Sequence, residues 1–268
     1  MIESASERYP YAGGFADFAY LSSLNASEKI REKIISARLM RGALPAIYDG
    51  LGDVGGLICN SGIDREAVWR ATHYKAAEFF APVCLYANHL GGGRVEFYVS
   101  NEKRQSFSGM LEYRVADSDN NTVYKSSEPF VIERATAKEI FAFDFGKYIS
   151  GHEREYYLEC NLRDSVGASS RSVTLFVPEK HYRFKDPDIK AQIVGADRRY
   201  CITLSAEAFA RGVELSFDKT DAVFYENYID LTGGSAVKIQ FTVIGSAQSA
   251  EQLAGELRIK SVYDVKKR

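Results

Sequence analysis

The sequence predicts a mainly β protein, with two β-sandwiches in tandem after a shorter α/β segment. Apolar residues recur about every 3.6 positions up to Ala81-Pro82 and about every 2 positions after it, the periods of an amphipathic helix and of a half-buried strand. The alternating stretches then follow one another between turn sequences, without a long helix, as in sandwiches. A polar stretch from Lys180 to Asp188 divides them into two blocks.

The α/β segment, residues 1–81, is predicted to contain a long helix, a buried strand and a second helix. Apolar residues three or four positions apart predict the first helix from Phe15 to Met40. The small apolar run from Ala43 to Ile47 predicts the strand, and a glycine-rich loop from Asp49 to Gly62 leads to a helix from about Asp64, its N-cap, to Phe80. One such unit cannot cover both faces of a buried strand, so the segment looks incomplete: either it docks on the residues that follow, or its missing partners lie upstream of Met1.

The first sandwich is predicted over residues 82–179 and the second over residues 180–268. In the first, Val95, Phe97 and Val99 alternate with more polar neighbours, which is the pattern of a strand with one buried face. In the second, the same alternation recurs at Cys201–Leu204, Val213–Leu215, Val237–Phe241 and Leu257–Ile259. We expect the polar stretch from Lys180 to Asp188 to be a linker.

Composition and charge argue against several classes of partner. The net charge is −2 and the pI about 6.2, so we expect no basic surface for nucleic acid. No apolar stretch approaches the roughly 20 residues of a membrane span. The amino terminus has an acidic residue, Glu3, where a signal peptide is positively charged. We therefore expect no nucleic acid partner, no membrane association and a cytoplasmic location.

The sequence also predicts no metal site and no cofactor. The four cysteines, Cys59, Cys84, Cys160 and Cys201, form no CxxC pair and no cluster with histidine, so we expect them to be reduced and structural. The stretch from Gly50 to Gly55 fits the pattern GxGxxG. The residues after it do not open a helix, which a dinucleotide site requires.

Three stretches occur in the order found in one known family. The first runs from Asp17 to Ala26. The second joins Gly42-Ala43-Leu44, Ser61 to Asp64, Trp69 to Tyr74 and Phe79 to Val83. The third, from Phe224 to Gly234, is similar to the family segment Phe-Ser-Asp-Asn-Phe-Phe-Asp-Leu-Leu-Pro-Gly. Together they resemble glycoside hydrolase family 2 enzymes, particularly the β-mannosidase branch, over nearly the whole chain.

The resemblance implies the carboxyl-terminal portion of such an enzyme: tandem immunoglobulin-like β-sandwiches preceded by an α/β remnant of a TIM barrel. In the family, the barrel strand after Gly-Ala-Leu lines the sugar pocket. This chain has Pro45 to Asp49 there, with Ala46 in the place of the pocket tryptophan. Tyr48 and Asp49 are therefore the candidate substrate-binding residues, and the family's sugar specificity is not carried over.

The resemblance also implies retaining hydrolysis of β-linked carbohydrate, with one glutamate as acid and base and a second as nucleophile. In the family both glutamates precede the portion matched here, and Glu3 lacks the nucleophile's sequence context. We therefore assign no catalytic residue and expect this part of a glycosidase to be inactive alone. Its expected partners are the missing amino-terminal barrel portion of the same enzyme and a β-linked carbohydrate.

Two other functions remain open. The sandwiches could form a non-catalytic module that binds carbohydrate or protein, or the chain could be a structural subunit that completes a separately encoded barrel. Three exposed aromatic residues on one sandwich face would favour carbohydrate binding. An apolar patch around Phe15, Phe18, Leu44 and Trp69 would favour the missing barrel.

Overall fold

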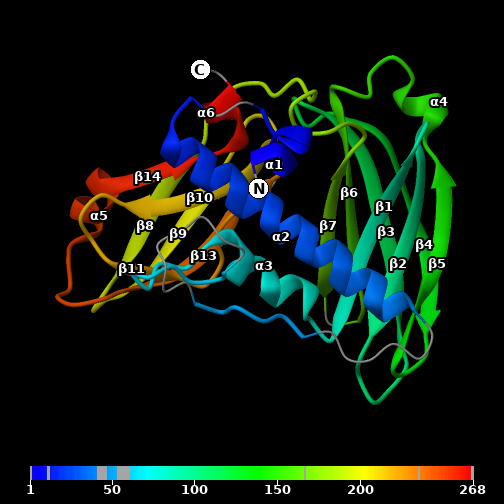
Figure 1. The fold of residues 1–268 in the computed structure, drawn as a ribbon, viewed down its shortest axis with the longest axis horizontal. Helices are drawn as coiled ribbons and strands as arrows, with labels where there is room; N and C mark the ends of the chain where they lie inside the picture. Colours follow the sequence, from blue (N-terminus) through cyan, green and yellow to red (C-terminus); the bar gives the residue numbers. More distant parts are fainter. Residues whose placement is uncertain are drawn as a thin grey trace. The chain divides into compact units, whose positions relative to one another are not determined.

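The computed structural model describes residues 2–10, 13–40, 47–52, 61–165, 167–234 and 236–266. The chain forms two compact units (Figure 1). The first comprises Met1–Tyr9, Ser22–Asp117 and Asn121–Arg183, and the second comprises Pro10–Leu21, Ser118–Asn120 and Phe184–Arg268. The domain boundaries predicted after residues 81 and 179 stay predictions.

The amino-terminal segment is helical. Helix α2 (Phe15–Leu39) confirms the long predicted helix, whereas helix α1 (Ile2–Arg8) was not predicted. Helix α3 (Ala71–Phe79) begins seven residues later than predicted. The strand predicted from Ala43 to Ile47 lies outside the described residues except for Ile47, which is not in a strand.

The late start of α3 has a local cause at Asp64. Its carboxylate accepts the backbone N–H groups of Glu66 and Val68, both at 2.9 Å. The predicted N-cap residue therefore closes a turn, as aspartate often does. Ala67 has a φ of 63°, in the left-handed region that a helix excludes. The prediction of a helix beginning at Asp64 is wrong for this reason.

The first sandwich has one sheet of three strands and one of four. The first sheet has the order β1-β2-β5 and the second the order β4-β3-β6-β7, with all pairs antiparallel. The strands are β1 (Val83–Gly91), β2 (Arg94–Asn101), β3 (Phe107–Asp117), β4 (Thr122–Ile132), β5 (Thr136–Asp144), β6 (Tyr156–Arg163) and β7 (Ala168–Leu175), and helix α4 (Gly146–Ile149) follows β5. Val95, Phe97 and Val99 of β2 are fully or almost fully buried, as their alternation predicted. They belong to a core that both sheets contribute to.

The second sandwich is smaller and has the same plan. Its sheets have the orders β11-β13-β9-β8 and β12-β10-β14. The elements are β8 (Lys190–Ala196), β9 (Arg199–Ser205), β10 (Ala210–Phe217), β11 (Ala222–Phe224), β12 (Ile229–Leu231), β13 (Val237–Val243), α5 (Ala250–Glu256), β14 (Leu257–Lys260) and α6 (Val262–Lys266). Helix α5 begins with a capping box, in which Ser249 and Gln252 each satisfy the other's backbone N–H.

The predicted linker is ordered at its start. Tyr182 is fully buried, and its hydroxyl donates to the carbonyl of Glu155 at 2.9 Å. The carbonyl of His181 accepts a hydrogen bond from Arg154 at 2.8 Å. Residues up to Arg183 therefore belong to the first unit, and the second unit resumes at Phe184.

Candidate functional site

The two candidate substrate-binding residues lie in a short irregular stretch, residues 47–52. Tyr48 is half-buried, and Asp49 is exposed, with its carboxylate accepting the N–H of Gly50 at 2.7 Å. The carbonyl of Leu51 accepts the N–H of Ile63 at 2.8 Å, and Gly52 pairs with Ile63 in an isolated parallel bridge. These bonds attach the stretch to the turn that precedes α3.

An aromatic cluster lies at the start of α3. Ile63 pairs with Trp69, and the ring of Trp69 lies 4.3 Å from that of His73 and 5.7 Å from that of Tyr74, measured between centroids. Burial lowers the pKa of His73, which favours the neutral ring. These contacts are those of a packed histidine rather than of a general base held by a carboxylate.

Arg38 fixes the carboxyl-terminal ends of α2 and α3 to the first sandwich. Its guanidinium donates to the carbonyl of Phe79 at 2.5 Å and forms an ion pair with Glu102 at 2.7 Å. The Phe79 carbonyl belongs to the last turn of α3, where no helical N–H is available. Arg38 therefore satisfies the end of α3 and joins both helices to the residue after β2.

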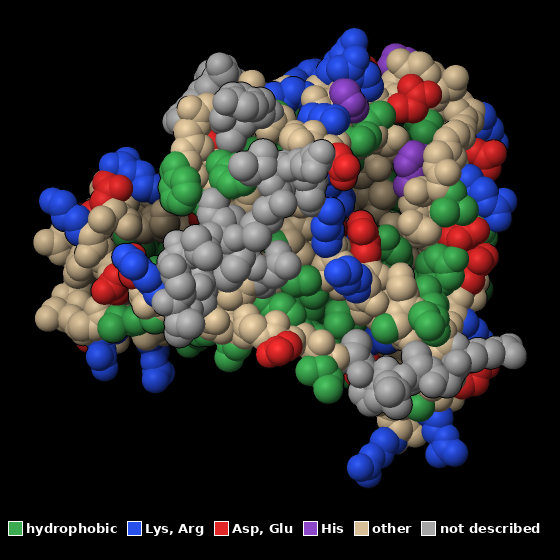
Figure 2. Space-filling model, viewed as in Figure 1, with side chains coloured by type: hydrophobic (Ala, Val, Ile, Leu, Met, Phe, Trp, Pro, Cys, Tyr) green, Lys and Arg blue, Asp and Glu red, His purple; other side chains and the backbone are tan. Residues whose placement is uncertain are grey.

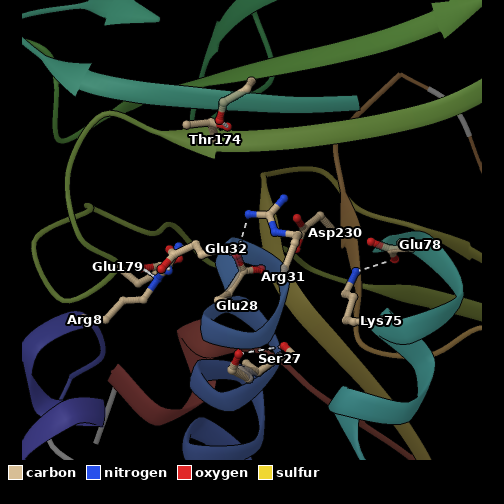
Figure 3. A network of polar contacts seen from close by, with 12 residues as sticks. Arg8, Ser27, Glu28, Arg31, Glu32, Lys75, Glu78, Thr174, Glu179 and Asp230 are labelled. Atoms are coloured by element: carbon tan, nitrogen blue, oxygen red, sulfur yellow. Dashed lines mark hydrogen bonds and ion pairs between the residues drawn. The ribbon is translucent and has the colours of Figure 1, made fainter. Parts of the chain in front are cut away.

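A second charged network holds α1 (Figure 3). Arg8 of α1 donates to the buried carboxylate of Glu179 at 2.9 Å and lies within 3.8 Å of Glu28 and 3.5 Å of Glu32, both on α2. The carbonyl of Arg8 accepts the N–H of Lys180 at 2.9 Å. This network connects residues that are 171 positions apart.

The third stretch used for the family resemblance has a structural role. Asn227 is buried, and its side chain accepts the N–H of Leu215 at 2.8 Å and donates to the carbonyl of Leu215 at 2.9 Å. Asp230 accepts the N–H of Gly212 at 2.8 Å and pairs with Arg211 at 2.5 Å. The side chains of Asn227 and Asp230 thus satisfy backbone groups of β10 that would otherwise bond to a neighbouring strand.

Among the carboxyl groups of the described residues, that of Glu214 has a raised pKa. Burial is the main cause, and the Tyr228 hydroxyl at 2.6 Å and the nearby Lys260 oppose it. Lys260 pairs with Asp17 at 2.9 Å. Within the described ranges, no group of three His, Cys, Asp or Glu residues could hold a metal ion.

Two family models match the sandwiches. Residues 93–181 match a mannosidase Ig/CBM-like domain, and residues 184–265 match the Ig-fold domain of mannosidases. The β-D-mannosidase of Dictyoglomus thermophilum has a similar structure, with a TM-score of 0.81 and 13% sequence identity over 97% of this chain and 31% of that chain. The chain belongs to the mannosidase-like proteins of glycoside hydrolase family 2.

A second member of this structural group is the exo-chitosanase of Amycolatopsis orientalis. It gives a TM-score of 0.69 and 16% identity over 97% of this chain and 35% of that chain. The chain thus spans about a third of the length of these two structures. No curated protein matches the sequence significantly.

The family 2 assignment confirms the predicted fold class. The chain is mainly β, with two immunoglobulin-like sandwiches after a small helical segment. In the described residues, no helix is long and apolar enough to cross a membrane.

Proposed function

We propose that the chain is the carboxyl-terminal portion of a retaining glycosidase that acts on β-linked sugars, with a β-mannosidase-like substrate preference. In this proposal residues 1–81 complete a TIM barrel whose remainder, including both catalytic glutamates, is the partner of this chain. Tyr48 and Asp49 face the sugar, and the enzyme is cytoplasmic. The family 2 assignment supports the reaction class.

The distribution of exposed apolar residues is the observation that favours this proposal. Thirteen large apolar side chains are exposed in the described residues, and six of them lie before Ala81: Phe15, Met40, Ile47, Leu51, Val68 and Phe80. Phe15 is 74% and Ile47 87% exposed. Figure 2 shows hydrophobic side chains gathered over α3. Apolar surface at this density is typical of an interface with another part of a protein.

The test compares the chain alone with the chain joined to the polypeptide encoded directly upstream. Both are assayed on aryl β-mannosides, with aryl β-glucosaminides and β-galactosides for comparison. We expect hydrolysis only when the upstream portion is present. Hydrolysis by the 268-residue chain alone would overturn the assignment of the catalytic residues to the missing portion.

The substrate role of Tyr48 and Asp49 is tested in the joined protein. Tyr48→Ala and Asp49→Asn should each lower kcat/KM by roughly tenfold or more, since each removes a contact to the sugar. Glu66→Gln, which removes an exposed charge on the turn that pairs with this stretch, is the matched control. An equal loss in all three variants would assign the effect to this region as a whole and contradict a specific sugar contact.

The alternative function is a non-catalytic module that binds carbohydrate or protein. One exposed tyrosine on the second sandwich, Tyr225, favours carbohydrate over protein, although the expected group of three aromatic residues is not found among the described residues. The residues around Tyr225 indicate which class of carbohydrate could bind there.

A further inference from the structure

The outer face of the sheet β11-β13-β9-β8 combines an exposed aromatic ring with unpaired positive charge. Phe224 of β11 is buried and pairs with Phe241, so the next residue, Tyr225, points outward opposite Gln240. The N–H of Tyr225 donates to the carbonyl of Gln240 at 2.9 Å and continues the strand pairing. The Tyr225 side chain is 61% exposed.

The ring of Tyr225 leans along the sheet. Its hydroxyl lies 3.4 Å from that of Thr242, which is two residues beyond Gln240 on β13. A ring held in this way leaves an apolar face open to solvent, and the apolar face of a pyranose can stack on it. The family segment similar to Phe224–Gly234 has serine at the position of Tyr225. The aromatic ring is therefore a feature of this chain rather than of the family pattern.

Two cations lie on the same face. Strand register places Lys238 opposite Thr203 and Arg199 opposite Thr242, and both cations are exposed. Within the described residues, neither forms an ion pair or hydrogen bond through its side chain. The outward positions of β13 and β9 include no aspartate or glutamate.

The first sandwich shows that this arrangement is not general in the chain. On the outer face of β4-β3-β6-β7, Arg163 pairs with Glu112 at 2.5 Å, and Arg114 and Arg171 both pair with Glu159 at 2.8 Å. The arginines of that sheet are neutralised by the sheet's own carboxylates. Lys238 and Arg199 leave their charge available to a ligand.

The spacing of the two cations selects the ligand. They are four residues apart along neighbouring strands, which corresponds to about 14 Å at the usual rise per residue and strand spacing. A single phosphate or sulfate ion would contact both only if the two long side chains converged on it. An oligosaccharide with repeated negative charges can contact each cation separately, with one of its rings on Tyr225.

We propose that this face binds an acidic oligosaccharide, with uronate or sulfate groups at Lys238 and Arg199 and a pyranose ring stacked on Tyr225. Gln240 lies between the levels of the two cations along the strands, and Thr203 lies opposite Lys238. Their amide and hydroxyl groups can hydrogen-bond to the sugar hydroxyls. This site does not depend on the proposed glycosidase function, and the test below requires no hydrolysis.

The test measures binding of the full chain by calorimetric titration. The probes are a β-1,4-linked mannuronate tetrasaccharide, a heparin-derived tetrasaccharide and neutral β-1,4-mannotetraose. We expect at least one acidic probe to bind roughly tenfold or more tightly than mannotetraose, and its affinity to fall as NaCl is added. The two acidic probes distinguish carboxylate from sulfate as the recognised group.

The variants assign the binding to residues. Tyr225→Ala should weaken it roughly tenfold, Lys238→Gln and Arg199→Gln severalfold each, and Tyr225→Phe should retain it. Arg163→Gln is the matched control, because it removes an exposed cation that is already paired on the other sandwich, and it should leave the affinity unchanged.

Three results would overturn the proposal. They are equal affinity for the neutral probe, an equal loss on Arg163→Gln, and no binding of any probe at millimolar concentration. A fourth contrary result could come from sedimentation of the chain without ligand. A dimer that Tyr225→Ala dissociates would make this face a contact between two copies instead.

Discussion

The first sandwich and the helices that precede it are stabilised by different kinds of contact. The sandwich has a continuous apolar core to which both sheets contribute. Helix α2 also buries apolar side chains, among them Leu24 and Ile34, but α1 and α2 add the charged contacts of Arg8 and Arg38, while Phe15 and Met40 remain exposed. The difference indicates that charged contacts help to hold the helices, and in the proposed enzyme their exposed apolar side chains would face the missing barrel portion.

The largest effect is expected in the sandwich core. Phe97 is fully buried and its ring packs against Tyr113 and Phe141. Phe97→Ala should lower the free energy of unfolding of the first sandwich by about 3–5 kcal/mol, since it leaves a cavity. Urea denaturation measures the loss, and Phe15→Ala, at an exposed position, is expected to change it by less than about 0.5 kcal/mol. Similar losses in both variants would contradict the contrast between core and helix.

Arg8→Met should have a large but local effect. Glu179 is 2% exposed, and it would lose the cation that offsets its burial. We expect a local destabilisation of about 3 kcal/mol, seen as faster hydrogen exchange in residues 2–10 and 178–182. The double variant Arg8→Met/Glu179→Gln should recover part of it. Unchanged exchange would show that the ion pair does not hold α1.

Tyr20→Phe should have a smaller effect on the second unit. The Tyr20 hydroxyl is buried and donates to the carbonyl of Gly212 at 2.7 Å. Its loss leaves that carbonyl without this donor and should cost about 1–2 kcal/mol in thermal or urea unfolding. Tyr263→Phe, which removes a tyrosine hydroxyl in an exposed contact with Asp186, is the matched control and should be nearly neutral.

The smallest effect concerns pH. Burial raises the pKa of Glu214, so the folded state takes up a proton at a higher pH than the unfolded state does. The contribution of Glu214 to stability should therefore be complete below the ordinary glutamate pKa of about 4.3 and decline as pH rises through the raised value. Glu214→Gln removes this dependence while keeping an acceptor for Tyr228. Parallel stability profiles of the two proteins between pH 4 and 7 would refute it.

Periodicity predicted the regular elements well because it reports burial on one face. Helix α2 and strand β2 are examples, at Phe15–Leu39 and Arg94–Asn101. It failed at Asp64, where a side chain caps a turn instead of a helix, because the same residue type is favoured in both places.

The contacts between residues far apart in the sequence had no comparable signal. Arg8 and Glu179 are far apart in sequence, and neither lies in a pattern that indicates a partner. The family resemblance selected Asn227 and Asp230 without showing that they satisfy the backbone of β10. Tyr225 lies within the stretch that resembles the family, but only the strand register placed it opposite Gln240 and on the same face as Lys238.

The buried amide of Asn227 makes the second sandwich sensitive to deamidation. It must accept from the N–H of Leu215 and donate to the carbonyl of the same residue. Deamidation keeps the shape of the side chain but replaces the donor with a charged acceptor, which then faces a carbonyl in a buried place. Deamidation of Asn227 alone should therefore destabilise the second sandwich.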